Sequence, residues 1–254
     1  MFDENGSMVV YSPYLVQRLQ HQGEDLYAWV KWSIVREWIA RTCPEGGLVL
    51  ELGSGSGSGR HWLSGVNYIG VDREAALRPD LVHDVRDIEG IARRLPGAPR
   101  AVLILDVLEH FEGKLADIHR VLSGVARSFI PGTRILISVP QWYRLDTLGL
   151  SRLHYPEHKV RLRHHEWARV IDSYVSIDDT QPLGVLSVIP YLIMLWPWYY
   201  ENGRSGRLFH WIRDRLMPRL PFLRPLDCAL SRFIGSLPGG TCFGNSLLFV
   251  CRVR

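Results

Sequence analysis

The residues with the clearest chemical meaning form the glycine-rich run Glu51–Gly57. Glycines at alternate positions, Gly53, Gly55 and Gly57, let a loop turn sharply and bring backbone N–H groups against a ligand. A Walker phosphate loop requires a lysine followed by serine or threonine after its glycines, and the continuation Ser58–His61 contains no lysine. The G-x-G-x-x-G fingerprint of dinucleotide-binding proteins is also absent, because serine or arginine stands at its third glycine position. An acidic residue followed by three alternating glycines remains as the pattern to explain.

Acidic residues also follow two other apolar segments. Asp72 ends one of them, and Asp106 ends another that continues into Glu109 and His110. Ligands of open α/β sheets bind at the carboxyl ends of the strands, so these side chains are expected near a ligand. Acidic residues are equally favoured at the start of a helix, where they complement the helix dipole. Both interpretations stay open for Glu109 and His110.

Four of the ten histidines gather in the segment 154–165. A histidine in a loop can remove a proton from an attacking hydroxyl, since its pKa lies near working pH. We favour His158 as this base. His164 and His165 precede a predicted helix and are interpreted as polar residues capping it.

The glycine spacing together with Asp72 resembles the first motifs of class I S-adenosylmethionine-dependent methyltransferases. The segment Leu105–His110 is similar to the "LEH" signature of small-molecule members of that family, and the resemblance extends from about Leu48 to Ile171. It implies that the glycine loop holds the methionine part of S-adenosylmethionine, and that Asp72 accepts hydrogen bonds from the ribose hydroxyls. The cofactor site implied by the resemblance comprises Glu51, Gly53, Ser54, Gly55, Gly57, Asp72, Arg73, Asp84, Val85 and Asp106. The implied catalytic residues are His158, His110 and Asp106.

Two further roles follow from the same resemblance. Asp84 is preferred over Asp87 as the acid that contacts the adenine amino group. Quinone-pathway O-methyltransferases and enzymes that methylate the ends of small RNAs place metal ligands in an acid-x-x-Glu-His string, which Asp106, Glu109 and His110 match. Carboxylates with one imidazole suit a hard divalent ion. Because no other ligand is identifiable, we expect no metal.

Four apolar segments bounded by turn residues predict strands. They are Leu48–Leu52, Tyr68–Asp72, Ala101–Asp106 and Arg134–Val139. Helices are expected at 88–95, 115–129 and 166–174. This alternation predicts a mainly parallel sheet covered by helices on both faces. The resemblance specifies the fold class as α/β, with a doubly wound seven-stranded sheet of the Rossmann-like methyltransferase type.

The segments on either side of this core are expected to cap it. Periodic apolar residues over 14–41, interrupted near a glycine, predict two N-terminal helices. The uncharged segment 180–200 is long enough for a membrane span, but its two prolines favour a buried or membrane-surface cap. We therefore expect one domain over 1–254. It comprises an N-terminal helical cap at 1–42, the cofactor-binding core at 43–180, an apolar and basic insertion at 181–240, and a last strand at 241–254.

Composition and motifs indicate the cellular environment and the class of partner rather than the activity. The net charge is +4 with a pI of about 9.0, and the four cysteines are widely spaced, which argues against a disulfide framework or a zinc site. The N-terminus lacks the pattern of a secretory signal, so we expect a cytoplasmic protein with peripheral membrane contact through 183–232 as an option. Enzymes that methylate base amino groups carry an Asn/Asp-Pro-Pro-Tyr/Phe string, and Val139-Pro-Gln-Trp142 stands there instead. A nucleic-acid partner is not expected.

The leading functional hypothesis is therefore methyl transfer from S-adenosylmethionine to a hydrophobic small molecule, such as a natural product, a quinone-like compound or a lipid. The aromatic N-terminal helices and the 183–240 insertion would select this acceptor. Arginines after the apolar segment favour a second hypothesis, a lipid-linked or phosphate-bearing acceptor at a membrane surface. A non-catalytic scaffold with the same fold is the alternative of another class.

Overall fold

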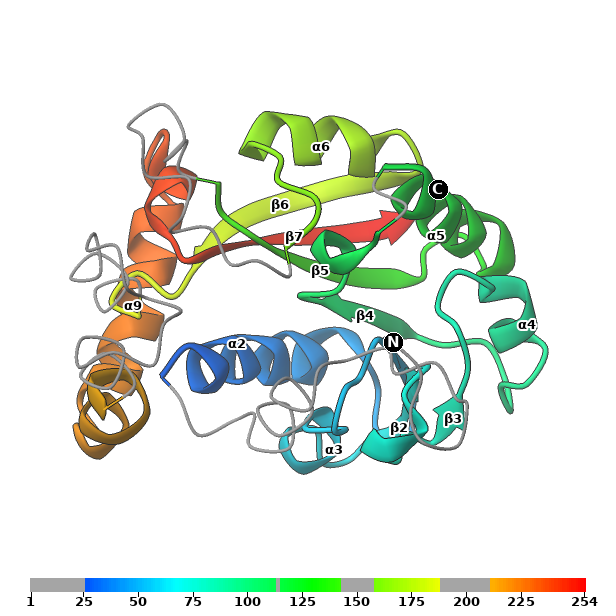
Figure 1. Cartoon of the computed structure of the whole chain (residues 1–254), viewed down its shortest axis with the longest axis horizontal. Helices are drawn as coiled ribbons and strands as arrows, with labels where there is room; N and C mark the ends of the chain where they lie inside the picture. Colours follow the sequence, from blue (N-terminus) through cyan, green and yellow to red (C-terminus); the bar gives the residue numbers. More distant parts are fainter. Residues whose placement is uncertain (1–25, 113–114, 143–157, 188–210) are drawn as a thin grey trace.

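The computed structural model describes residues 26–112, 115–142, 158–187 and 211–254. The first predicted N-terminal helix and most of the uncharged segment lie outside these ranges. The described chain forms one seven-stranded sheet with helices on both faces (Figure 1). In chain order its principal elements are α2 (Leu26–Thr42), β1 (Leu48–Leu52), α3 (Gly59–Trp62), β2 (Asn67–Asp72), β3 (Leu81–Val82), α4 (Ile88–Ala92), β4 (Ala101–Leu105), α5 (Leu115–Ser128), β5 (Arg134–Pro140), α6 (His164–Asp172), β6 (Val175–Leu183), α9 (Leu223–Gly235) and β7 (Ser246–Val253).

The strand order is β3-β2-β1-β4-β5-β7-β6, with β1 to β5 parallel and β7 antiparallel to both of its neighbours. The chain first builds outward from β1 to β3 and then returns to build outward from β4 on the other side. The neighbours β1 and β4 therefore mark the point where the winding reverses. In such sheets ligands bind at the carboxyl ends of the strands beside this point. The glycine run and Asp106 follow these two strands directly.

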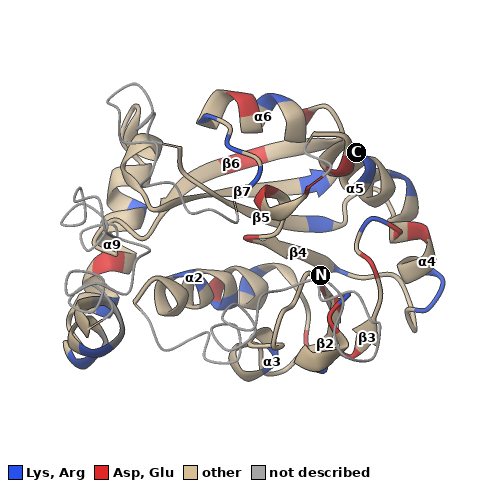
Figure 2. Ribbon diagram, in the orientation of Figure 1, with Lys and Arg blue, Asp and Glu red and all other residues tan. Residues whose placement is uncertain are grey.

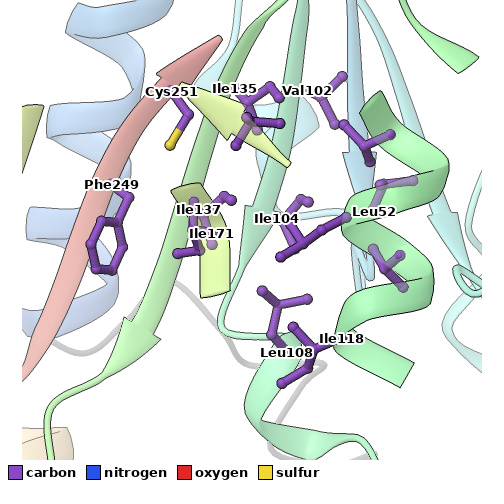
Figure 3. Close-up of a cluster of buried hydrophobic side chains, with 14 of the residues drawn as sticks. Leu52, Val102, Ile104, Leu108, Ile118, Ile135, Ile137, Ile171, Phe249 and Cys251 are labelled. Atoms are coloured by element: carbon purple, nitrogen blue, oxygen red, sulfur yellow. The ribbon is translucent and has the colours of Figure 1, made fainter. Parts of the chain in front are cut away.

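The two faces of the sheet carry separate apolar cores because successive strand residues point to opposite sides. Leu52, Ile104 and Ile137 face the core shared with α4, α5 and α6 (Figure 3). Val49 and Leu103 face the second core, shared with α2, α3 and α9. Every residue of β1 and β4 is buried, as expected for strands covered on both faces. The helix α2 thus lies directly under the strands that carry the candidate site.

The mainly parallel, helix-covered sheet confirms the predicted fold class. The strand prediction at 48–52 is correct to the residue, and the other three strands differ by one residue at an end. Two strands, β3 and β6, were not predicted. Residue 180, where we placed the end of the core, lies inside β6.

The described part of the insertion before the last strand consists mainly of α9. A π-helical turn (Ile212–Leu216) and a 3-10 turn (Met217–Arg219) lead into it, and a second 3-10 turn (Gly240–Phe243) leads from it toward β7. Among the described residues, none of the helices has both the length and the apolar character needed to cross a bilayer.

Candidate active site

The glycine loop leaves β1 with three left-handed residues. Gly53, Gly55 and Gly57 have φ values of 73°, 54° and 71°, a region that side chains rarely adopt. At Gly53 a Cβ would also lie 2.5 Å from a methyl carbon of Val107. Backbone N–H groups of Gly53 and Ser54 both donate to the Val71 carbonyl, at 2.8 and 3.0 Å. The loop is therefore fixed to the end of β2, and its left-handed backbone explains why glycine stands at these three positions.

Glu51 lies beneath this loop and is 3% exposed. Its carboxyl group accepts a hydrogen bond from the Tyr68 hydroxyl. Burial raises the pKa of Glu51 to about 7, although the hydrogen bond from Tyr68 and the charge of Lys31 act in the opposite direction. The carboxyl group is thus close to half-ionised at neutral pH, and a cationic ligand group beside it would favour the charged form.

This buried carboxyl predicts a specific pH dependence of stability. The folded-state pKa of Glu51 is about 7 against an ordinary value of 4.5, so the folded state retains a proton that the unfolded state releases. The free energy of unfolding therefore falls as pH rises from about 4.5 through about 7, by about 3 kcal/mol from this residue. Urea unfolding at pH 5 and pH 8 measures it. Glu51→Gln should lose this share of the pH dependence, and identical pH dependence in variant and wild type would contradict the assignment.

Asp72 links the glycine loop to the end of β2. Its Oδ2 accepts a hydrogen bond from the Gly55 N–H and its Oδ1 from the Glu74 N–H, each at 2.9 Å. The residue is 2% exposed, and burial raises the pKa of its carboxyl group while the two N–H groups lower it. A carboxylate offers about four acceptor positions, and two are used here. The remaining lone pairs can accept hydrogen bonds from a diol placed at the strand end.

The two acids of the following loop have different roles. Asp87 caps α4, because its Oδ1 accepts a hydrogen bond from the Gly90 N–H at 2.9 Å. Asp84 is not a cap: it accepts hydrogen bonds from the Arg86 backbone and guanidinium, and this pairing holds the pKa of Asp84 below its usual range. Val85 packs in the core beside α4. Asp84 is thus a half-buried acid paired with Arg86, whereas the helix-cap interpretation holds for Asp87.

At the end of β4 the carboxylate of Asp106 collects three side-chain donors. Lys31 Nζ lies 2.8 Å from Oδ2, the Ser138 hydroxyl donates to Oδ1 at 2.7 Å, and the Tyr27 hydroxyl donates to Oδ1 at 3.0 Å. The Tyr27 oxygen also lies 2.8 Å from the Ser246 hydroxyl, which can donate to it. Asp106 has a φ of 56°, so the chain turns in a left-handed conformation that aspartate tolerates better than most residues.

Electrostatics keep this cluster ionised although it is buried. Burial alone would raise the pKa of Asp106, but the Lys31 ammonium and the three hydrogen bonds hold it below its ordinary range. Lys31 is 6% exposed, and burial together with Asp106 raises the pKa of Tyr27 well above its usual value. A carboxylate with a fixed orientation therefore stands at the point where the sheet winding reverses. No sequence pattern singles out Lys31 or Ser138, and only the four-residue spacing of Tyr27 and Lys31 on one helix face could have suggested that these two residues act together.

The turn after β4 brings Glu109 between two imidazoles. Glu109 Oε1 lies 3.8 Å from His110 Nε2 and 4.0 Å from His158 Nε2, and the two rings meet edge to face. The Lys159 and Val160 N–H groups donate to the Glu109 carbonyl at 2.7 and 3.0 Å, which holds the segment of His158 against this turn. His110 and His158, each predicted to be catalytic, are distant in the sequence and are thus brought side by side. The turn Leu108–His110 is a short 3-10 helix and not the start of α5.

The Glu109 carboxyl group is fully buried, and neither of its oxygens has a hydrogen-bond partner. Burial, with the neighbouring charge of Asp106, raises its pKa well above the ordinary range. Ligand atoms of Glu109, His110 and His158 all lie within 4.8 Å of one another, so a divalent cation could be held there. Our expectation of no metal rested on the lack of a further ligand. The structure supplies one in His158, which sequence spacing could not identify.

The remaining predicted residues are placed away from this cluster or outside the described ranges. His164 and His165 are the first two residues of α6, but the helix is capped by Glu166, whose carboxylate accepts a hydrogen bond from the Arg163 N–H at 2.7 Å. The predicted capping role of the two histidines is therefore wrong. His164 stacks on Phe249, and burial lowers its pKa. Of the predicted substrate-lining segments, 1–25 and 188–210 lie outside the described residues.

Comparison with known proteins places the fold. The sequence matches no protein-family model and no curated protein. Among solved structures, a chain of the complex between the Haloferax volcanii Trm112 methyltransferase activator and a methyltransferase matches with a TM-score of 0.57 and 18% identity over 95% of each chain. N-methyltransferase NodS from Bradyrhizobium japonicum, in complex with S-adenosyl-L-homocysteine, matches with a TM-score of 0.54 and 8% identity over 95% of this chain and 97% of that chain.

A third solved structure, an S-adenosylmethionine-dependent methyltransferase from Archaeoglobus fulgidus, matches with a TM-score of 0.52 and 15% identity, over 95% of this chain and all of that chain. Identities this low carry information about the fold rather than the activity. This protein has the mainly parallel, seven-stranded Rossmann-like fold of S-adenosylmethionine-dependent methyltransferases.

Proposed function

We propose that this protein is an S-adenosylmethionine-dependent methyltransferase whose acceptor is a hydrophobic small molecule. The observation that carries the proposal is the meeting of three features at the point where the sheet winding reverses. A left-handed glycine loop follows β1, the buried carboxylate of Asp72 ends β2, and the fixed carboxylate of Asp106 ends β4. The likeness in fold supports the same activity.

The residues present fit the cofactor. The Glu51 carboxylate can pair with the positively charged amino group in the methionine part of the cofactor, and this pairing would favour the ionised form of Glu51 over the protonated one. The N–H groups and small side chains of Gly53–Gly57 allow close approach, Asp72 offers lone pairs to the ribose hydroxyls, and Asp84 lies on the loop proposed for the adenine amino group. Arg73 and Val85 complete the proposed site as neighbours of these acids.

When bound, S-adenosylmethionine would supply a methyl group on a sulfonium, with a neutral thioether as the leaving group. The protein then has to orient the two partners and exclude water. Asp106, fixed by Tyr27, Lys31 and Ser138, is suited to orient the acceptor beside the donor. His158, with His110 alongside, is proposed as the base that receives the proton of a protic acceptor.

The proposed acceptor class follows from the helices beside this site. The helix α2 presents Tyr27 to Asp106, and Trp29 packs edge to face on Trp62 in the same layer. Apolar and aromatic surroundings with a few directed polar groups are typical of sites for hydrophobic ligands. Retention of Glu51 and Asp72 in register with the glycine loop argues against the scaffold alternative.

A second candidate acceptor is a lipid-linked or phosphate-bearing molecule at a membrane surface. It is favoured by the arginines and exposed apolar side chains of the described segment 211–243. Both acceptor classes use the same cofactor site, so the distinction lies only in where the methyl group is delivered.

The proposal is tested by following a labelled methyl group. The protein is incubated with S-adenosyl-[methyl-¹⁴C]methionine and an organic extract of the cells in which the protein naturally occurs. The products are then partitioned between an organic solvent and water. We expect protein-dependent label in the organic phase, absent with Asp72→Asn. Label found only in water-soluble or macromolecular products would contradict a hydrophobic acceptor. The labelled organic-phase products are then separated by chromatography, and phosphorus is measured in each fraction. Label in fractions that contain phosphorus indicates the phosphate-bearing acceptor, and label in fractions without it indicates the other class.

A further inference from the structure

The helix α9 keeps large apolar side chains on its outward side, although part of its inward side is polar. Its inward face carries Asp227, Cys228 and Ser231, all buried. Asp227 Oδ1 and Oδ2 accept hydrogen bonds from the Leu186 and Ser187 N–H groups at 3.0 and 3.1 Å, so the polar side is committed to the protein. A surface helix ordinarily turns its apolar side inward and its charged side to water. In α9, Leu223 and Cys228 pack inward as usual, but Leu226 and Phe233 face outward.

The outward side is a narrow apolar stripe. Phe222, which precedes the helix, is followed by Leu226, Ala229 and Phe233 at spacings of four, three and four, which an α-helix places on one face. The large members are exposed by 58% (Phe222), 44% (Leu226) and 62% (Phe233). Burying such a side chain is ordinarily worth about 2 kcal/mol, so the stripe forgoes a large stabilisation unless it is covered by something.

Further exposed apolar side chains lie on the turns that contact α9. Of the ten large hydrophobic side chains exposed in the described residues, seven lie between 211 and 243 and include the only exposed tryptophan and phenylalanines of that set. We call this set the apolar surface: Trp211, Leu216, Phe222, Leu226, Phe233, Leu237 and Phe243. A concentration of this kind marks an interaction site more often than scattered apolar residues do.

The charged residues around the apolar surface are arginines. Arg215, Arg219 and Arg232 are exposed, and the segment 211–243 contains only two acids, of which Asp227 on α9 is buried. Figure 2 shows the basic and acidic positions on the ribbon of this part of the protein. Exposed aromatic and leucine side chains flanked by arginine are typical of helices that lie in the plane of a membrane interface. Each arginine near an anionic bilayer contributes about 1 kcal/mol of attraction.

We propose that the apolar surface docks on an anionic phospholipid bilayer, with α9 lying in the interface and Arg215 and Arg219 at the level of the lipid phosphates. A second copy of the chain fits less well. In a two-fold dimer the same patch meets itself, and among the side chains described in this patch no exposed acid is present to pair with the arginines of the other copy.

Docking would also bring the candidate active site to the membrane. Arg232 pairs with Glu37 of α2, and the Arg224 guanidinium lies 5.4 Å from the ring centre of Trp29 on the same helix. The helix α2 carries Tyr27 and Lys31, which bind Asp106. Docking through α9 would thus hold α2, which contacts the candidate site, close to an acceptor dissolved in the bilayer. This consequence rests on the proposed function, whereas docking itself does not.

The test is co-sedimentation of the full chain with vesicles of mixed phosphatidylcholine and phosphatidylglycerol, and with vesicles of phosphatidylcholine alone. Wild type should bind the mixed vesicles, and this binding should weaken with added salt. Leu226→Ser/Phe233→Ser should bind at least about tenfold more weakly. Arg215→Ser/Arg219→Ser should lose the preference for the anionic vesicles. The matched control is Val82→Ser/Ile130→Ser, whose side chains are 50% and 53% exposed elsewhere, and it should bind like wild type.

Absence of wild-type binding, or equal binding by the Leu226→Ser/Phe233→Ser variant, would overturn the proposal. So would a wild-type dimer that this variant converts to a monomer without any vesicle binding, since the apolar surface would then join two copies. Titration of the same variants with S-adenosyl-L-homocysteine reports separately on the proposed function. A variant that no longer binds vesicles but still binds S-adenosyl-L-homocysteine would show that the docking surface is independent of the cofactor site.

Discussion

Replacing Asp106 with asparagine is expected to lower the free energy of unfolding by about 3–5 kcal/mol, because it leaves a buried ammonium without its counter-charge. Lys31 is 6% exposed and lies 2.8 Å from the Asp106 carboxylate. Asparagine preserves the side-chain size and tolerates the left-handed backbone at this position, so the change isolates the charge. Urea unfolding at neutral pH measures the loss.

A double-mutant cycle provides the control. Adding Lys31→Met to Asp106→Asn removes the unpaired ammonium and should restore most of the stability, since a buried ion pair replaced by neutral groups is often close to neutral overall. If Asp106→Asn alone proves as stable as wild type, or if Lys31→Met does not restore stability, Asp106 is not held by Lys31 as described.

Replacing His158 with alanine is expected to lower the turnover of methyl transfer about 100-fold for an acceptor that must lose a proton. His158 Nε2 faces the Glu109–His110 turn, and its segment is held there by two backbone hydrogen bonds. Binding of S-adenosyl-L-homocysteine should stay unchanged in the variant, so that the loss is confined to turnover. Initial rates from pH 5 to 9 show whether the loss persists at every pH.

The matched control for this change is His165→Ala, because His165 is exposed at the start of α6 and outside the cluster. It should leave the turnover and its pH profile unchanged. Treatment with EDTA should also leave the wild-type rate unchanged if His158 acts as a base. Loss of activity in EDTA that a divalent cation restores would instead assign Glu109, His110 and His158 as metal ligands. Normal turnover of His158→Ala across the pH range would remove it from the chemistry altogether.

The sequence predicted the centre of the sheet because burial on both faces leaves an unmistakable pattern. Residues 48–52 and 101–105 are apolar apart from Glu51 and are bounded by turn residues, so their limits were nearly correct. The strand β6 was missed because it is the edge strand, with exposed Asp178 and Asp179 and a proline near its end, which weakens the alternation of polar and apolar residues. The two-residue strand β3 is too short to produce a pattern.

The candidate site was predicted where its residues are contiguous, and missed where it depends on distant contacts. The glycine loop with Glu51 is one short segment, whose left-handed turns follow from its glycines. Lys31 is 75 residues from Asp106 in the chain, so their ion pair could not be derived from spacing. The contact of His158 with Glu109 depends likewise on how the chain after β5 returns to the turn after β4. The inward polar face of α9 becomes visible only when its burial is known.

The central claim, that the glycine loop and Asp72 form an S-adenosylmethionine site, is tested most directly by calorimetric titration with S-adenosyl-L-homocysteine. Wild type, Asp72→Asn and a parallel titration with NAD are compared, with circular dichroism confirming that the variant is folded. We predict micromolar binding by wild type, a loss of at least about tenfold in Asp72→Asn for the lost charge-assisted hydrogen bonds to the ribose, and no binding of NAD. Absence of binding, or a preference for NAD, would contradict the assignment of this fold to methyl transfer.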